Sequence, residues 1–119
     1  MELSVVSLEP GLIRLACSGE ITANHLIGNP DPLGKLLGPD VYGQRIMLGL
    51  QQARFIDSAG VGWIVNSHRK FVERGGRLVL YSIPPLIEQT LQLLKVGRLV
   101  PLAGEEAAAR TLVAAGGRP

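Results

Sequence analysis

The sequence predicts an α/β domain, an open, mostly parallel β-sheet with helices packed on it. Two short runs, Arg45 to Leu50 and Leu78 to Tyr81, are apolar almost throughout, which is typical of strands buried on both faces. A helical pattern follows each run, and helices that alternate with buried strands indicate a parallel sheet. The chain has 119 residues, enough for one compact domain and too few for two, so we expect residues 1–119 to form a single domain.

The composition excludes several classes of protein. Hydrophobic residues make up 46% of the chain and charged residues 18%, so a substantial core is expected and general disorder is not. The net charge is +2 and Lys and Arg form no cluster, which argues against nucleic-acid binding. A single cysteine, Cys17, excludes a disulfide framework. The N-terminus lacks the pattern of a signal peptide and no apolar run approaches a membrane span, so we expect a cytoplasmic protein without direct membrane insertion.

The first two strands are expected to form a hairpin. Leu3 to Leu8 and Leu12 to Ser18 have the composition of short strands, and Pro10-Gly11 between them is typical of a tight turn.

Residues 22–43 are the hardest part of the chain to assign. Thr22 is expected to cap a short helix, Ala23 to Ile27, which the Gly- and Pro-rich residues 28–32 end. Leu33 to Leu37 predicts one further helical turn before Gly38-Pro39. The sequence leaves open whether this region is a loop or two short helical pieces.

The longest predicted helix runs from Ala59 to Arg74, and Gly75-Gly76 predicts a left-handed C-cap at its end. Its apolar stripe, at spacings of i, i+3, i+4, i+7 and i+11, is Val61, Ile64, Val65, His68 and Val72. Because His68 lies on this stripe, a place at the edge of the core is favoured over catalysis. Trp63 falls outside the stripe, and two interpretations stay open: an exposed anchor for a partner, or packing under the first helix.

The C-terminal third is expected to hold two helices and a strand. Pro84-Pro85 opens the first helix, because the missing amide of Pro is no loss in a first turn. Arg98 to Leu102 predicts the last strand, and Glu105-Glu106 begins a final helix that Gly116-Gly117 closes. The predicted order is β-β-α-β-α-β-α-β-α. The expected buried stripe of the first of these helices is Ile87, Thr90, Leu91 and Leu94, with Leu86 and Leu93 on a less buried line.

Small residues occupy the turn between the central strand and the longest helix. Asp57 and Ser58 are residue types that cap helix N-termini, and Ala59 and Gly60 have almost no side chain. Gly60 and Gly62 each cost roughly 1 kcal/mol of helix stability relative to Ala. We therefore expect another surface to approach the backbone here, at a docking or modification site. The carboxyl ends of parallel strands, where Ser58 falls, are also where functional sites of such sheets lie.

The residues of this turn resemble a known signature. Phe55-Ile56-Asp57-Ser58-Ala59-Gly60-Val61-Gly62 is similar to the F-x-D-S-(S/T/A)-G-L-G pattern of STAS domains of the anti-sigma-factor antagonist type. The resemblance continues through Gly75-Gly76, Ser82-Ile83-Pro84 and the segment from Leu91 to Pro101, and Gly19-Glu20-Ile21 matches the G-E-(I/L) after the second strand. It extends over nearly the whole chain and implies a STAS-type open mixed β-sheet.

The resemblance also implies a partner switch controlled by phosphorylation of Ser58. In the family, the unphosphorylated protein binds an anti-sigma factor that is a serine kinase of the histidine-kinase-like ATPase fold, and phosphorylation ends the binding. A metal-dependent PP2C-type phosphatase restores the serine. The implied protein is a regulatory binding module and no enzyme, without catalytic residue, cofactor or metal. The expected partner-binding residues are Asp57, Ser58, Ala59, Gly60, Val61, Gly62, Trp63 and Lys95.

Two features depart from the family pattern. Residues 28–43 are richer in Gly and Pro than the family's first helix, which puts a partner contact there in doubt. Lys95 stands where the family often has Gly, beside the helix that usually borders the interface, and this bears on partner choice.

The same residues admit other interpretations. Asp57-Ser58 fits a plain helix cap. A hydrolase nucleophile elbow needs G-x-S-x-G, and Ile56 occupies the first glycine position. A phospho-aspartate receiver needs an acidic pair after the first strand, where only Glu9 is found. The alternative function is a non-catalytic scaffold or accessory subunit of a stress-signalling or lipid-transport complex. No metal-ligand spacing relates His25, His68 and Cys17.

Overall fold

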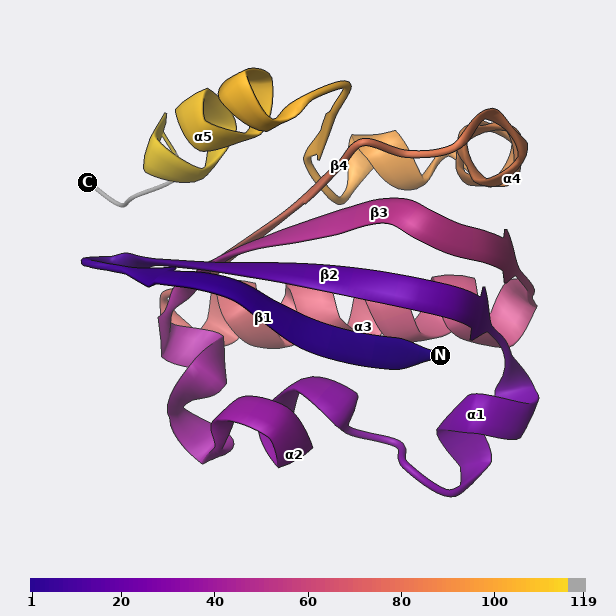
Figure 1. Ribbon diagram of the computed structural model, residues 1–119, viewed down its shortest axis with the longest axis horizontal. Coiled ribbons are helices and arrows are strands. Elements are labelled where there is room, and N and C mark those ends of the chain that lie inside the picture. Colours follow the sequence, from indigo (N-terminus) through magenta and orange to yellow (C-terminus); the bar gives the residue numbers. More distant parts are fainter. Residues whose placement is uncertain (116–119) are drawn as a thin grey trace.

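A computed structural model describes residues 1–115 of the chain. Five strands form one open sheet in the order β1-β2-β3-β4-β5 (Figure 1). The first pair is antiparallel and the three following pairs are parallel, which confirms the predicted mixed α/β fold. The strands are β1 (Glu2–Glu9), β2 (Leu12–Ile21), β3 (Arg45–Ile56), β4 (Arg77–Tyr81) and β5 (Leu102–Ala103).

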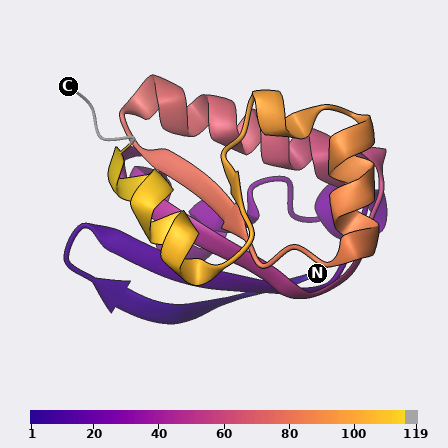
Figure 2. The ribbon, with the colours of Figure 1, turned by 90° about the horizontal axis from the view of Figure 1, so that it is seen from above.

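Helices cover both faces of the sheet. The long helix α3 (Ser58–Arg74) packs on the face that Ile46 and Leu48 enter, and the short helices α1 (Ala23–Ile27) and α2 (Pro32–Leu37) lie on the same side (Figure 1). The opposite face carries Met47 and Val79, which pack against Ala109 and Val113 of α5 (Glu106–Ala115). Figure 2 shows α5 lying over β3 and β4. The alternation of side chains along β3 and β4 thus supplies two separate cores.

The predicted hairpin is confirmed. Glu9 pairs with Leu12 across the turn, and Gly11 there has a φ of +75°, a left-handed conformation that glycine adopts without strain. Both strands run further than expected, and the register of β1 shifts between Val5 and Ser7.

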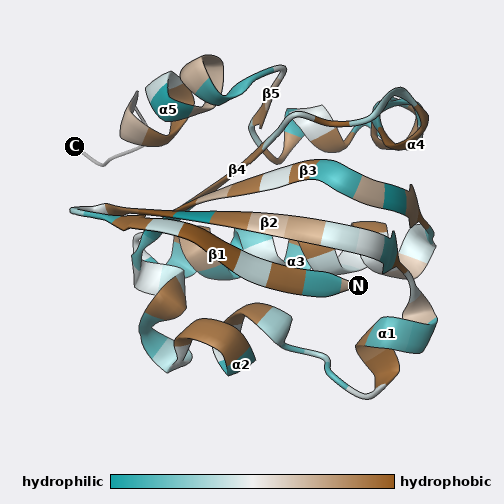
Figure 3. Ribbon diagram, in the orientation of Figure 1, coloured by the Kyte–Doolittle hydropathy of each residue, from teal (hydrophilic) through white to brown (hydrophobic). Residues whose placement is uncertain are grey.

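The central strand β3 is longer than the predicted Arg45 to Leu50. Its two neighbouring strands pair with it over different lengths. β4 pairs with β3 only as far as Gly49, whereas β2 continues to pair with it up to Ile56. Figure 3 shows a hydrophilic stretch in β3 after its hydrophobic first half. The extension contains polar residues such as Gln51 and Gln52, so the apolar run in the sequence ends before it and does not predict it.

Residues 22–43 form short helical pieces rather than a loop. The helix α1 has the predicted bounds, α2 begins one residue earlier than the predicted Leu33, and an unpredicted 3-10 helix, η1 (Pro39–Gly43), follows them. The expected capping role of Thr22 is wrong: it is the N-cap residue, but its hydroxyl pairs with Nδ1 of His25 (3.0 Å) and makes no capping hydrogen bond.

The apolar stripe predicted for α3 is wrong at two places. Val61 and Ile64 are buried as expected, but Val72 is 63% exposed and Phe71 is fully buried in its place. Trp63, expected outside the stripe, is only 8% exposed. The reason is that α3 packs against η1 and α1 as well as against the sheet, which widens and rotates its buried face.

The C-terminal third contains α4 (Pro85–Leu93), the 3-10 helix η2 (Val96–Arg98) and the last strand. The predicted strand Arg98 to Leu102 is largely wrong, since only Leu102–Ala103 pairs, with Leu80 and Tyr81. Ile87 and Leu91 of α4 are buried, Thr90 is half-buried, and Leu94 is exposed, contrary to prediction. The closing glycines Gly116-Gly117 lie outside the described residues.

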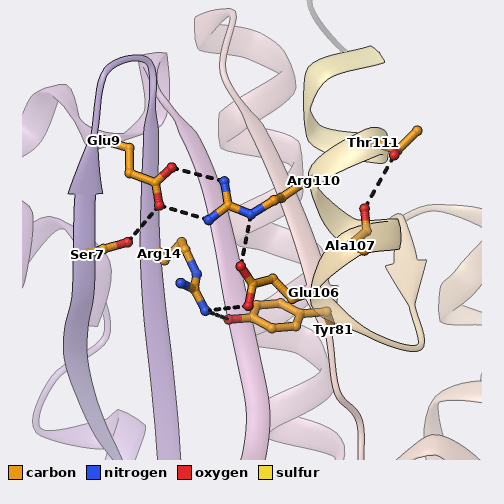
Figure 4. A network of polar contacts seen from close by, with 8 residues as sticks. All are labelled: Ser7, Glu9, Arg14, Tyr81, Glu106, Ala107, Arg110 and Thr111. Carbon is orange, nitrogen blue, oxygen red and sulfur yellow. Dashed lines mark hydrogen bonds and ion pairs between the residues drawn. The ribbon is translucent and has the colours of Figure 1, made fainter.

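An ion-pair network ties α5 to the hairpin (Figure 4). The guanidinium of Arg110 donates two hydrogen bonds of 2.9 Å to the carboxylate of Glu9 and a third of 2.9 Å to Glu106. Glu106 in turn accepts a hydrogen bond of 3.0 Å from Arg14 on β2. The hydrogen bonds from Arg110 are the main cause that lowers the pKa of Glu9 to about 2.

Candidate functional site

The turn from β3 into α3 is organised by the carboxylate of Asp57. Asp57 is the N-cap of α3, and its Oδ1 accepts a hydrogen bond from the amide of Gly60 (2.9 Å). This bond satisfies one of the amides that the first turn of a helix leaves without a partner. Asp57, rather than Ser58, is therefore the capping residue, and Ser58 is the first residue of the helix.

The same carboxylate holds a second segment in place. Its Oδ2 accepts a hydrogen bond from the amide of Ala23 at the start of α1 (3.1 Å), and the amide of Asp57 donates to the carbonyl of Ile21 (3.3 Å). Hydrogen bonds from the amides of Gly60 and then Ala23 lower the pKa of Asp57, because they stabilise the charged form. Asp57 thus joins the ends of β2 and β3 to the starts of α1 and α3.

Ser58 and Ala59 are exposed directly beside this cap. The side chain of Ser58 projects from the first turn of a 17-residue helix, where free amides and the helix dipole favour negative charge. The position is accessible to a modifying enzyme and suited to carry a phosphate.

The two glycines of this turn have different structural roles. Gly60 is buried, and a Cβ on it would lie 2.7 Å from Cγ1 of Ile56 and closer still to the carbonyl oxygen of Ile21. Its small size is needed for α3 to pack on the sheet, so the interpretation of Gly60 as a point of approach for another surface is wrong. A Cβ on Gly62 would meet no heavy atom within 4 Å.

The structure brings some of the expected partner-binding residues to the surface and not others. Ser58 and Ala59 are exposed and Asp57 and Gly62 half-buried, whereas Gly60, Val61 and Trp63 are buried. Lys95 is exposed but lies on another element, after α4. Lys95 has a φ of +57°, the left-handed conformation that explains why glycine suits this position.

A groove beside α3 was not foreseen from the sequence. It has a volume of about 510 Å³, and α3 forms one wall from Ala59 to Glu73. The opposite wall comes from Leu26, Pro30 and Tyr42. Its walls are far apart in the chain, so no local pattern could have indicated it.

The structure reports on three further expectations. His68 is half-buried, burial lowers its pKa, and its Nδ1 is buried without a hydrogen-bond partner in the described part of the chain, as expected of a residue at the edge of the core. Within residues 1–115, no three His, Cys, Asp or Glu side chains are grouped so that they could hold a metal ion. Nor does any helix in this range have the length and hydrophobicity needed to cross a membrane.

Comparison with known proteins agrees with this arrangement. Residues 10–109 match the STAS domain family. An anti-sigma F factor antagonist from Paenibacillus polymyxa is 25% identical over 68 residues, which are 57% of this chain and 58% of that protein. The matched part therefore spans little more than half of that relative.

Solved structures have the same fold. A Thermotoga maritima protein, provisionally assigned as an anti-sigma factor antagonist, has a TM-score of 0.81 at 21% identity over 94% of both chains. The anti-sigma factor antagonist SpoIIAA in its unphosphorylated form has a TM-score of 0.64 at 15% identity over 98% of this chain and 100% of that chain. The phosphorylated form of SpoIIAA from Bacillus has a TM-score of 0.63 at 19% identity over 93% of this chain and 99% of that chain. Because the family match extends over residues 10–109, most of the sequence, this chain belongs to the STAS domain family.

Proposed function

We propose that this protein is an anti-sigma-factor antagonist whose binding to an anti-sigma serine kinase ends when Ser58 is phosphorylated. The observation that carries the proposal is the exposed hydroxyl of Ser58 at the first position of α3, directly after the Asp57 cap. The names of the relatives support it: the P. polymyxa protein is called an anti-sigma F factor antagonist, and SpoIIAA has been solved with and without its phosphate.

Phosphorylation at this position is compatible with the fold. A phosphoserine adds about −1.5 to −2 charges at neutral pH. At the N-terminus of α3 the helix dipole favours this charge by roughly 0.3 to 1 kcal/mol. Asp57 opposes it by repulsion, but Ser58 is exposed and Asp57 only half-buried, so water and salt weaken the repulsion. We therefore expect the phosphorylated protein to stay folded.

The effect on binding is opposite. A partner that covers Ser58 and Ala59 would take the phosphate out of water, and an unmatched dianion in an interface costs several kcal/mol. A cost of about 4 kcal/mol corresponds to roughly a thousandfold loss of affinity. The switch therefore operates on association and leaves the domain intact.

The rest of the proposed system follows from the same step. A PP2C-type phosphatase removes the phosphate and returns the protein to its binding form. The protein itself contributes a surface and a phosphate acceptor and no catalysis, and it acts in the cytoplasm, where its kinase has ATP.

The first test is intact-mass and phosphopeptide analysis of the protein from its native cells. We expect a species about 80 Da heavier, the mass of one phosphoryl group, that maps to Ser58 and is missing in Ser58→Ala. Ser4→Ala, at an exposed serine on β1, is the matched control and should keep the heavier species. A protein that stays unmodified in growth and stress would refute the switch and favour a scaffold role.

A second test separates binding from folding. Ser58→Asp should lose at least tenfold in affinity for the kinase while its thermal unfolding midpoint stays within about 2 °C of the wild type. A Ser58→Asp protein that no longer folds would contradict the proposal, because the loss of binding would then be a loss of structure.

A further inference from the structure

The groove beside α3 has the size and lining of a ligand site. Its volume of about 510 Å³ lies within the range of roughly 300 to 1,000 Å³ that is usual for sites of small molecules. Leu26, Pro30 and the ring of Tyr42 give it an apolar wall, and Trp63 and Ser67 contribute from the α3 side. The side chain of Tyr42 is fixed by an edge-on contact with Phe71 and by a hydrogen bond from its hydroxyl to Asp31, so this wall is formed before anything binds.

The packing of the fold does not require a glycine at position 62. A glycine inside a helix costs roughly 1 kcal/mol relative to alanine. At Gly60 packing explains that cost, but at Gly62 a Cβ would meet no heavy atom within 4 Å. Gly62 lines the groove, so the missing side chain leaves the groove open at its α3 wall.

Two buried residues of α3 line the same groove, Trp63 and Ser67. Trp63 contributes its ring, because its indole Nε1 has almost no accessible surface and a ligand in the groove would not reach it. Ser67, which is 4% exposed, contributes a hydroxyl one helical turn away. This hydroxyl can donate a hydrogen bond to an oxygen of a ligand.

The charges at the rim favour an anion. Arg69 and Lys70 line the groove together with one acidic residue, Glu73, so the rim has a net charge of +1. The ammonium of Lys70 lies 5.2 Å from the centre of the Tyr42 ring, which keeps this cation over the apolar wall. An aromatic floor with donors and a cation beside it fits a molecule that is apolar at one end and anionic at the other.

We propose that the groove binds a small organic acid, whose apolar body lies over Gly62 between Tyr42 and Trp63 and whose carboxylate accepts hydrogen bonds from the hydroxyl of Ser67 and the Arg69–Lys70 rim. The site is separate from the phosphate acceptor, but it begins at Ala59, the residue after Ser58. A bound acid therefore lies against the surface proposed to meet the kinase.

The test uses 4-phenylbutyrate as the probe and 4-phenyl-1-butanol as its uncharged counterpart. The chain has one tryptophan, so a two-dimensional NMR spectrum contains one indole N–H signal, that of Trp63. We expect 4-phenylbutyrate to move this signal in a saturable way, with a dissociation constant of about 1 mM or tighter, and the alcohol to bind at least tenfold more weakly. No saturable shift up to about 10 mM of the acid, or equal binding of the alcohol, would overturn the proposal.

Three variants locate the site. Gly62→Leu fills the groove without a clash at its Cβ, so the protein should melt no lower than the wild type. Its affinity for 4-phenylbutyrate should fall at least tenfold. Lys70→Gln should lower the affinity for the acid and leave the affinity for the alcohol unchanged. This variant tests the proposal even if Gly62→Leu fails to fold. Leu93→Ser, at a leucine on α4 that is 83% exposed, is the control for binding at other apolar surface and should change nothing. Loss of binding in Leu93→Ser with retention in Gly62→Leu would refute the groove as the site. These measurements need no kinase, so they succeed or fail independently of the switch at Ser58.

Discussion

Alanine at Gly60 and alanine at Gly62 are expected to change the stability of the domain in opposite directions. Both substitutions add the same methyl group to the same helix, two residues apart, and each gains up to about 1 kcal/mol of helix propensity. At Gly62 the added Cβ meets nothing within 4 Å, so the gain is kept. We expect Gly62→Ala to raise the free energy of unfolding by about 1 kcal/mol and the melting temperature by about 4 °C.

At Gly60 the same methyl group meets the sheet. Its Cβ would lie 2.7 Å from Cγ1 of Ile56 and nearer still to the carbonyl oxygen of Ile21, which is held because it accepts the amide of Asp57. Ile21 and Ile56 are both buried, so the helix itself must move away. Overpacking of this kind costs about 3 kcal/mol. After the helix gain, the net loss for Gly60→Ala is about 2 kcal/mol, which makes a difference of about 3 kcal/mol between the two variants.

Urea unfolding measured by far-ultraviolet circular dichroism gives both values. The signal comes from the backbone, so it does not depend on Trp63, whose fluorescence a change at the adjacent Gly62 would alter. Equal m-values in the three proteins would show that the same surface is exposed on unfolding. A Gly60→Ala protein as stable as the wild type, or a Gly62→Ala protein less stable than it, would refute the distinction between the two glycines.

Three further predictions concern other parts of the chain. Lys95→Gly should raise the free energy of unfolding by about 0.5 to 1 kcal/mol, because it relieves the left-handed conformation at the end of α4; an equal gain in Lys95→Ala would contradict this reason. Since Arg110 lowers the pKa of Glu9 from 4.5 to about 2, the charged form of Glu9 stabilises the fold fully above pH 4.5, and this contribution is lost as the pH falls to about 2. Glu9→Gln should thus lower the melting temperature at pH 7 and flatten its decline between those pH values, whereas Glu20→Gln at an exposed position on β2 should do neither. Burial raises the pKa of Cys17 to about 11, so Ellman's reagent at pH 8 should label it only as fast as the protein opens; labelling at the rate of a free thiol would refute its burial.

Local signals were sufficient for most of the fold. The Pro10-Gly11 turn, the apolar run of β4 and the left-handed cap at Gly75, with a φ of +85°, each act within a few residues, and each was predicted where it occurs. The alternation of strands and helices predicted a mostly parallel sheet, and β2 to β5 are paired in parallel.

The predictions are wrong where contacts between distant segments of the chain determine the structure. The second half of β3 exists because β2 continues beside it, and Phe71 is buried in place of Val72 because η1 brings Tyr42 against α3, with ring centres 5.0 Å apart. A helical stripe derived from spacing assumes that the helix packs against one partner. The helix α3 packs against the sheet and also against η1 and α1.

The candidate site was predicted in position but not in its details. The sequence indicated that the β3–α3 turn carries Ser58 at its surface, and the structure has this serine exposed at the start of the helix. It could not indicate that Gly60 serves internal packing while Gly62 does not, since both look alike in the sequence. The second hydrogen bond of Asp57, to a residue 34 positions earlier, was equally invisible.

That shared carboxylate has a consequence for how the domain opens. The amides of Ala23 and Gly60 are hydrogen-bonded to the two oxygens of one side chain, so the first turns of α1 and α3 are fastened by a single fixed point. Local unfolding proceeds in cooperative units, and these two turns are expected to exchange their amide hydrogens as one unit although they are far apart in the chain. A disturbance at the start of α3, the turn that carries Ser58, is therefore expected to reach the first turn of α1 as well.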